Sequence, residues 1–182
     1  MDILEYERTM NMEDIHELYN KAGELHGHYC PGLAIGVRAA AIAAEKLPIT
    51  DKQSKSLYCV AEKSACFLDG IQALAGCTFG KGNLIYRPTG KTAFTFYDTA
   101  EGKSLRLMMK AMPEGLDRQQ KTEFILTAPE EDVFQIGKAR FPLPKGEERR
   151  PEIPCSVCGE LTDEGRMRVV DGKPVCLDCA GL

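Results

Sequence analysis

The chain has 182 residues, and its 43% hydrophobic content is enough to bury the core of one domain with at most a small appendage. It carries 23 Lys and Arg against 27 Asp and Glu, for a net charge of −4. This mixed, slightly acidic character argues against a nucleic-acid or membrane-surface binder, so neither is an expected partner.

The eight cysteines have to be explained for a reducing compartment. The first ten residues, MDILEYERTM, are acidic and lack the apolar core of a secretory signal. The longest apolar stretch, LAIGVRAAAIAAEKL, contains Arg38 and is too short to span a bilayer. We therefore expect a cytoplasmic protein whose cysteines bind metal or act in catalysis rather than form disulfides.

The order of the predicted elements indicates the fold class. Apolar residues at helical spacing predict helices at 12–25, 32–47 and 64–76. Strand patterns at 56–63, 84–88, 92–98 and 104–110, the last three separated by glycine-containing turns, predict a short strand followed by an antiparallel meander. Helical patterning returns over 114–138, with a break at Pro129. Residues 1–138 are therefore expected to form an α+β domain, with helices packed on a mostly antiparallel sheet.

The C-terminal part has its own cysteine pattern. Four prolines and a charge run predict a linker over 139–154. Beyond it, two C-x2-C pairs are separated by seventeen residues: Cys155 and Cys158, then Cys176 and Cys179. Four thiolates complete a tetrahedral zinc site with no open position, so residues 155–182 are expected to fold around a structural zinc.

The stretch HGHYCP places His26, His28 and Cys30 at alternate positions. In an extended segment all three side chains would point to one side, as metal ligands would. Cys30 precedes Pro31, which suits the first position of a helix, so Cys30 is expected at the N-cap, where the helix dipole favours a thiolate. The alternative is a polar loop that joins two helices.

The middle of the chain offers further candidates for the same site. Cys66 and Asp69 share a face of the predicted helix, and Cys77 follows that helix in a loop. Each also has an ordinary explanation, as a small buried apolar residue or a solvated carboxylate. The loop GCTFGKGN fails the spacing of a P-loop, although its glycines and Lys81 could approach an anion.

Three blocks resemble one known family: HGHYCPGLAIGVRAA, CFLDGIQALAGCTFGKGNL and GKTAFTFYD are similar to the formylmethanofuran dehydrogenase E-subunit family. The tail resembles the zinc-finger appendage, treble-clef or ribbon in kind, of some members. The resemblance implies an α+β core, a homodimer, and an accessory role beside a molybdenum- or tungsten-dependent enzyme that reduces carbon dioxide to formylmethanofuran. The positions that match the family's motifs are His26, His28, Cys30, Cys66, Asp69, Cys77, Lys81, Gly90 and Lys91.

These observations lead to a metal-site hypothesis for the core. The expected ligands of zinc or another transition metal are His26, His28, Cys30, Cys66 and Cys77. Cys30, Asp69 and Lys81 are the candidates for catalytic roles. Three functions stay open: an oxidoreductase-associated accessory component, a stand-alone metalloenzyme for a small anionic or one-carbon substrate, and a metal or sulfur carrier.

Overall fold

The computed structural model of the chain describes residues 12–47, 56–145 and 150–182, with side chains from Ile15 onward. The chain divides into two compact units, residues 1–144 and residues 145–182, called here the core unit and the tail unit. Within the described segments, no helix is both long and apolar enough to cross a membrane.

A five-stranded sheet with the order β2-β1-β3-β4-β5 forms the base of the core unit. Its strands are β1 Leu57–Ala61, β2 Leu84–Tyr86, β3 Ala93–Asp98, β4 Lys103–Met109 and β5 Phe134–Gly137. All neighbouring pairs are antiparallel except β1 and β2. The sheet and its helices confirm the expected α+β class.

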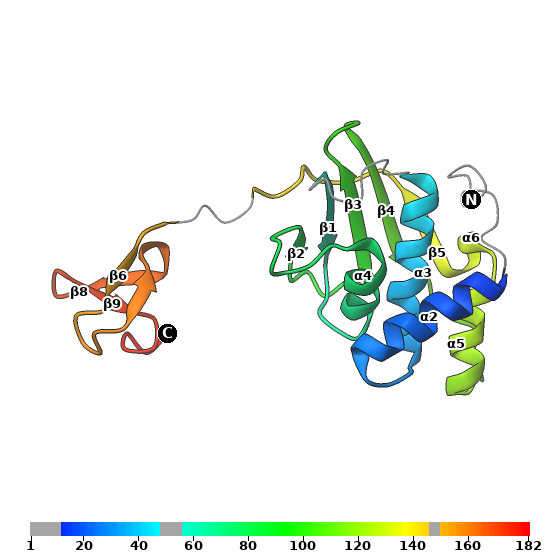
Figure 1. Cartoon of the computed structure of the whole chain (residues 1–182), viewed down its shortest axis with the longest axis horizontal. Coiled ribbons are helices and arrows are strands. Elements are labelled where there is room, and N and C mark those ends of the chain that lie inside the picture. The colour runs from blue at the N-terminus through cyan, green and yellow to red at the C-terminus, as the bar shows by residue number, and fades with distance from the viewer. Residues whose placement is uncertain (1–11, 48–55, 146–149) are drawn as a thin grey trace. The chain divides into compact units, whose positions relative to one another are not determined.

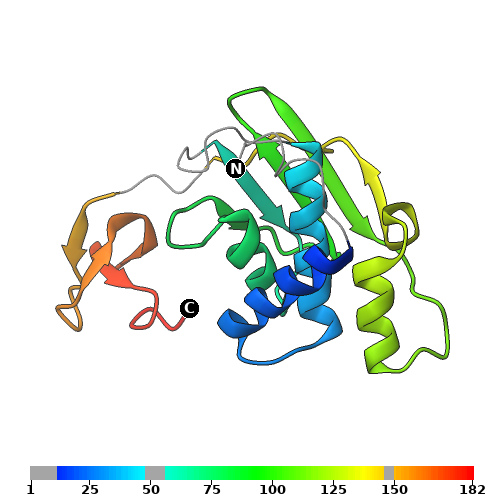
Figure 2. The ribbon, with the colours of Figure 1, turned by 45° about the vertical axis from the view of Figure 1, so that its right-hand side comes forward.

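The helices of the core unit lie on one side of the sheet (Figure 1, Figure 2). They are α2 Met12–His26, α3 Pro31–Lys46, α4 Phe67–Ala75, α5 Arg118–Thr127 and the short α6 Glu130–Val133. The alanine-rich α3 is central and packs against α2, α4 and α5. Alternate residues of β3 and β4, among them Phe94, Phe96 and Leu107, are fully buried in the apolar layer that these helices cover.

Helices α3 and α4 approach each other closely because two glycines face across their contact. A Cβ atom on Gly36 would lie 2.7 Å from the carbonyl carbon of Phe67. A Cβ atom on Gly70 would lie 2.7 Å from the backbone nitrogen of Val37. Both distances are shorter than real Cβ contacts, so the crossing depends on residues without a side chain.

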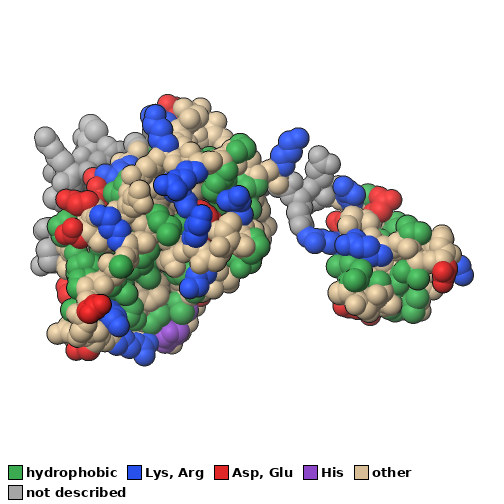
Figure 3. All heavy atoms as spheres, turned by 180° about the vertical axis from the view of Figure 1, so that it is seen from behind, with side chains coloured by type: hydrophobic (Ala, Val, Ile, Leu, Met, Phe, Trp, Pro, Cys, Tyr) green, Lys and Arg blue, Asp and Glu red, His purple; other side chains and the backbone are tan. Residues whose placement is uncertain are grey.

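The other face of the sheet carries a buried ion pair between Glu62 and Arg106. Thr89 donates a hydrogen bond to the same carboxylate over 2.6 Å. Residues 139–141 belong to this face, because Tyr97 donates to the carbonyl of Phe141 over 2.7 Å. The view from behind shows Lys and Arg side chains spread over the core unit among apolar ones (Figure 3).

Two elements differ from the sequence-based prediction. Strand β2 is not part of a meander: the chain passes through α4 between β1 and β2, and a crossover of this kind returns the strand parallel to the first. Residues 134–137 form strand β5 instead of continuing a helix. In that strand Phe134 and Ile136 pack on the core while Gln135 and Gly137 are exposed, which is a period of two rather than 3.6.

The tail unit consists of two small hairpins. Its elements are β6 Glu152–Pro154, β7 Leu161–Asp163, the 3-10 turn η1 Glu164–Arg166, β8 Met167–Val170 and β9 Lys173–Cys176. Strand β6 pairs with β7, so the predicted linker ends before residue 152, and it begins after Phe141, which contacts the core unit. Asp171 and Gly172 join β8 to β9 with φ angles of 48° and 77°, as an Asp-Gly hairpin turn requires.

Candidate metal centre

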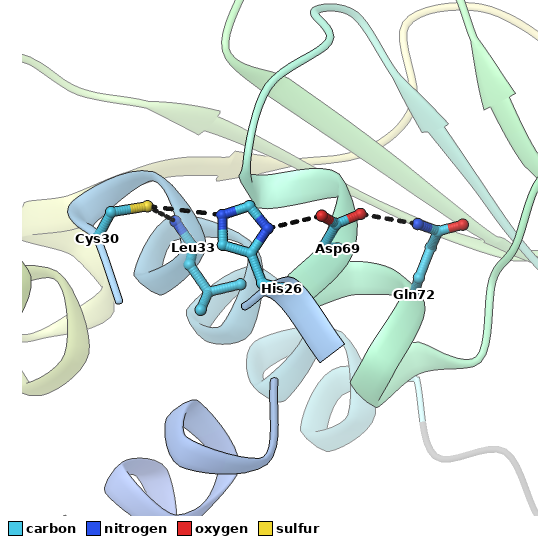
Figure 4. Close-up of polar contacts among 5 residues, drawn as sticks. All are labelled: His26, Cys30, Leu33, Asp69 and Gln72. Atoms are coloured by element: carbon cyan, nitrogen blue, oxygen red, sulfur yellow. Dashed lines mark hydrogen bonds and ion pairs between the residues drawn. The ribbon is translucent and has the colours of Figure 1, made fainter. Parts of the chain in front are cut away.

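The end of α2 and the start of α3 bring His26 and Cys30 together. Gly27 leaves helix α2 with a φ of 79°, and Cys30 is the N-cap of α3, directly before Pro31. The Cys30 sulfur accepts a hydrogen bond from the Leu33 backbone N–H over 3.3 Å, as the sequence predicted for an N-cap cysteine. The Nε2 atom of His26 lies 4.0 Å from this sulfur (Figure 4). These two side chains converge through a turn between two helices and not through the extended segment that the alternate spacing indicated.

Cys66, at the start of helix α4, lies beside Cys30. Cys66 is the N-cap of α4 but makes no capping hydrogen bond with its side chain. A Cβ atom on Gly32 would lie 3.6 Å from the Cys66 sulfur and 3.7 Å from the Cys30 sulfur, so the two thiols flank this glycine. Burial and the neighbouring Cys30 thiol raise the pKa of Cys66. A cation between the sulfurs would reverse this effect, because it favours both thiolates.

One potential ligand atom from each of four residues, His26, His28, Cys30 and Cys66, lies within 4.8 Å of the other three. We call these residues the core cluster. A tetrahedral zinc ion with bonds of about 2.0–2.3 Å needs ligand atoms roughly 3.3–3.8 Å apart, so a small contraction would close the cluster around an ion. Two thiolates and two imidazoles are also a common zinc donor set. The side chains present therefore fit zinc or a similar transition metal.

Asp69 orients one of the histidines. Its Oδ2 atom lies 2.7 Å from Nδ1 of His26, and its Oδ1 atom accepts a hydrogen bond from Gln72 over 3.0 Å (Figure 4). A histidine that gives its Nδ1–H to a carboxylate presents Nε2 as the ligand atom, and Nε2 is the atom that faces Cys30. The contact gives Asp69 a positioning role toward His26; its predicted catalytic role stays a prediction.

The side chains of Tyr19, Tyr29 and Arg118, which the sequence did not indicate, stabilise the turn between α2 and α3. The Tyr19 hydroxyl donates to the carbonyl of Cys30 over 3.1 Å, and Arg118 of α5 donates to the carbonyl of Tyr29 over 2.9 Å. The Tyr29 ring packs against Gly23, where any side chain would collide with it. Every residue has a backbone carbonyl that can accept a hydrogen bond, so no sequence pattern predicts which carbonyls these side chains will contact.

Two predicted site residues lie outside the core cluster. Cys77 is fully buried, and its thiol donates to the carbonyl of Leu57 over 3.7 Å. Burial raises the pKa of Cys77 to about 12, which favours the neutral thiol of a small core residue. Lys81 is exposed and lies near Gly76 and Cys77. The structure thus places Cys77 and Lys81 together, but not with the four clustered ligands.

The matched positions Gly90 and Lys91 belong to a turn beside Glu62, just past the end of β1. The backbone N–H of Gly90 donates to the carbonyl of Glu62 over 2.9 Å, and the N–H of Ala93 donates to the carbonyl of Lys91. Gly90 has a φ of 78°, which a residue with a side chain rarely adopts. The third sequence block therefore supports the buried Glu62–Arg106 pair.

The tail unit holds a second group of possible ligands. Its four sulfurs, from Cys155, Cys158, Cys176 and Cys179, lie within 4.8 Å of one another, as the two C-x2-C pairs predicted. The backbone N–H groups of Cys176 and Val157 point at the Cys155 sulfur from 3.3 and 3.4 Å. Hydrogen bonds of this kind, the one from Cys176 foremost, lower the pKa of Cys155 to about 6. The neighbouring cysteine side chains, Cys176 foremost, have the opposite effect on Cys179 and raise its pKa to about 12. A bound cation would remove this increase because it favours the thiolate.

Together these features define a class: an α+β protein with a His/Cys candidate metal site in its core unit and a four-cysteine zinc finger in its tail unit. Residues 25–136 match the family described as FmdE, molybdenum formylmethanofuran dehydrogenase operon, and residues 148–182 match the prokaryotic dksA/traR C4-type zinc finger. The chain belongs to the FmdE family, as the three sequence blocks indicated.

Two individual proteins illustrate this relationship. A protein of Archaeoglobus fulgidus, named probable S-adenosyl-L-methionine-binding protein, is 30% identical over 97% of this chain, which spans 56% of that protein's length. The crystal structure of an FmdE-like protein from Syntrophus aciditrophicus, related to the E subunit of tungsten formylmethanofuran dehydrogenase, has a similar fold, with a TM-score of 0.67. The likeness covers 94% of this chain and 95% of that one at 23% sequence identity, and it establishes the fold.

Proposed function

We propose that this protein binds two metal ions: one transition metal ion, zinc or a chemically similar ion, at the core cluster, and one structural zinc in the tail unit. The observation that carries the core site is the convergence of four ligand atoms within 4.8 Å, one of them on a histidine oriented by a carboxylate. Histidines that bind metal are commonly oriented by a carboxylate in this way.

Each residue of the core site has a distinct task in this proposal. Cys30 and Cys66 supply thiolates from two helix N-termini, and at Cys30 the Leu33 backbone N–H favours the negative charge. His26 supplies Nε2, and Asp69 holds its tautomer and ring orientation. A bound ion would supply Lewis acidity toward a ligand in its coordination sphere.

We further propose that the protein acts as a homodimeric accessory component beside a molybdenum- or tungsten-dependent enzyme. Membership of the FmdE family supports this role. An accessory role predicts that the metal-loaded protein has no turnover alone, whereas the metalloenzyme alternative predicts turnover of a small anionic or one-carbon substrate. The carrier alternative with Cys77 as an exchange partner has less support, because Cys77 is fully buried. Size-exclusion chromatography with light scattering tests the dimer.

The name of the Archaeoglobus relative raises S-adenosyl-L-methionine as a ligand. The chain spans only 56% of that protein, so the binding named there can reside in the remainder. Metal binding is therefore the function that the geometry supports best.

Metal analysis of the purified full chain tests the proposal. We expect two equivalents of metal in the wild type and one in Cys30→Ser. Serine is itself a good N-cap, so this change removes the thiolate while α3 keeps its start. Cys77→Ser is the matched control, a buried cysteine outside the core cluster, and should retain two equivalents. A wild-type protein with only the tail metal, or a Cys30→Ser variant with both, would show that the core site is wrong.

A further inference from the structure

The four side chains of the core cluster are not held equally. Asp69 fixes the ring of His26, whose side chain is 10% exposed, and the Leu33 N–H fixes the Cys30 thiol. His28 is exposed to solvent and touches the His26 ring, with 4.2 Å between the ring centroids. Among the residues that the structure describes, none forms a hydrogen bond with the His28 ring. His28 is therefore the ligand with the least support from the fold.

The backbone next to His28 also has open space beside it. Gly27 precedes it with a φ of 79°, and no atom lies within 4 Å of the position that a Cβ on Gly27 would occupy. The hydrogen bonds from Tyr19 and Arg118 that anchor the turn are made to the carbonyls of Cys30 and Tyr29, which follow His28 in the chain. A rotation of His28 away from the cluster would therefore disturb neither anchor. A ligand without a hydrogen-bond partner to orient it is also bound less firmly than one that has such a partner.

We propose that His28 is an exchangeable ligand of the core metal and that a small organic thiol binds, as its thiolate, in the position that His28 leaves. This inference rests on the proposed core metal site. In the exchange the bond from the His28 nitrogen to the metal breaks, a bond from the thiolate sulfur forms, and the thiol proton passes to solvent. No electron is transferred, so no oxidant or reductant is required.

The surroundings of His28 favour a thiol over an oxyanion. A thiolate in place of His28 would give the ion three thiolates and one imidazole, which is also a common zinc donor set. Zinc and similar ions accept soft sulfur donors readily. Leu25 and Tyr29, three positions before His28 and one after it, are 61% and 51% exposed, so apolar surface for the carbon part of a thiol is available nearby in the chain. A strongly hydrated oxyanion would lose water against such side chains without compensation.

Cobalt substitution of the full-length protein tests this inference without any assay of activity. Tetrahedral Co²⁺ reports its ligands through visible absorption, and the tail cobalt with four thiolates provides a constant background. We compare the wild type, His28→Ala, His26→Ala and the control His16→Ala, which removes the half-buried histidine paired with Glu123. Each protein is titrated with Co²⁺, and then with 2-mercaptoethanol or inorganic phosphate.

Wild type and His16→Ala should each hold two Co²⁺. His28→Ala should also hold two. Its core site should bind Co²⁺ at least about tenfold more tightly than the core site of His26→Ala. 2-Mercaptoethanol should shift the core cobalt spectrum of the wild type, and that of His28→Ala at lower concentration, whereas phosphate should leave both unchanged.

The possible failures point to different errors. A single Co²⁺ in the wild type would refute the core metal site itself. If the wild type holds two but His28→Ala loses the core ion as completely as His26→Ala, the site stands and His28 is a fixed ligand. If phosphate shifts the spectrum and the thiol does not, the assignment of the incoming ligand is wrong.

Discussion

The close contact of α3 and α4 at Gly36 and Gly70 makes the core cluster depend on backbone packing between the two helices that carry Cys30 and Cys66. Cys30 is the N-cap of α3 and Cys66 is the N-cap of α4, so the distance between these helices sets the distance between the two thiols. We predict that Gly36→Ala pushes the helices apart and thereby weakens both the fold and the metal site.

The structure gives the size of this displacement. The new methyl group would lie 2.7 Å from the carbonyl carbon of Phe67, about 0.7 Å short of the 3.4 Å at which ordinary contact begins, and it would meet the carbonyl oxygen more closely still. The atom in the way is backbone and cannot rotate aside. Overpacking of this kind costs about 1–3 kcal/mol, which the helix propensity of alanine offsets by up to about 1 kcal/mol. Metal–ligand distances tolerate only about 0.2 Å, so core metal affinity should fall by more than about tenfold.

Two measurements check this prediction: the free energy of unfolding in urea, and a competitive metal titration of the core site. Gly70→Ala serves as a second variant, because it opposes Val37 at 2.7 Å across the same crossing. Gly80→Ala is the control, with no atom within 4 Å of its Cβ position, and should change stability by no more than about 0.5 kcal/mol. If Gly36→Ala and Gly70→Ala both keep wild-type stability and core affinity, the close crossing does not position the site.

The other predictions concern the supports of the two metal sites and the buried ion pair. Asp69→Ala removes the carboxylate that orients His26 and should lower core metal affinity by about 10- to 100-fold in the same titration, while the tail ion remains. Arg118→Ala removes one of two anchors of the ligand turn, so its effect on affinity should be smaller than that of Asp69→Ala. Glu62→Gln leaves a buried guanidinium without its counter-charge and should cost about 3–5 kcal/mol in urea unfolding, whereas Glu101→Gln, in an exposed pair, should cost less than about 1 kcal/mol. A strong chelator should unfold the tail unit, as limited proteolysis would detect, and leave the helices of the core unit intact in circular dichroism.

Much of the fold could be predicted because local signals are strong. Pro31 marks the start of α3, which places Cys30 at its N-cap, and Asp171-Gly172 marks the turn between β8 and β9. Strand β5 shows where local signals fail. It has four residues and follows a single helical turn that begins after Pro129, and a pattern this short fits either period.

The sequence predicted the types of residue in the candidate site, but not which of the predicted residues lie together. The sequence placed Cys66 and Asp69 on one helix face, yet the partner of Asp69 is His26, which is 43 positions away. Cys77 fits the pattern of a ligand and that of a small apolar core residue, and only the packing of its loop under β1 separates the two. Gly32 carries a further signal in the sequence. Glycine is unfavourable in a helix, so its place in the first turn of α3 indicates that another group approaches closely, here Cys66.

The two proposed metals differ in what the fold requires of them. The tail unit fully buries little beyond Cys155, Val175 and Cys176, so its hairpins have almost no apolar core and depend on metal for their folding energy. The core unit has its own apolar layer, including Phe94 and Phe96, which holds its helices on the sheet. An ion at the core cluster would add only the linkage term, about 2.7 kcal/mol when free metal is 100 times the dissociation constant. The proposed core site lies at the start of two helices and has one proposed ligand exposed to solvent. Such a site is better suited to binding an external ligand than to holding the protein together.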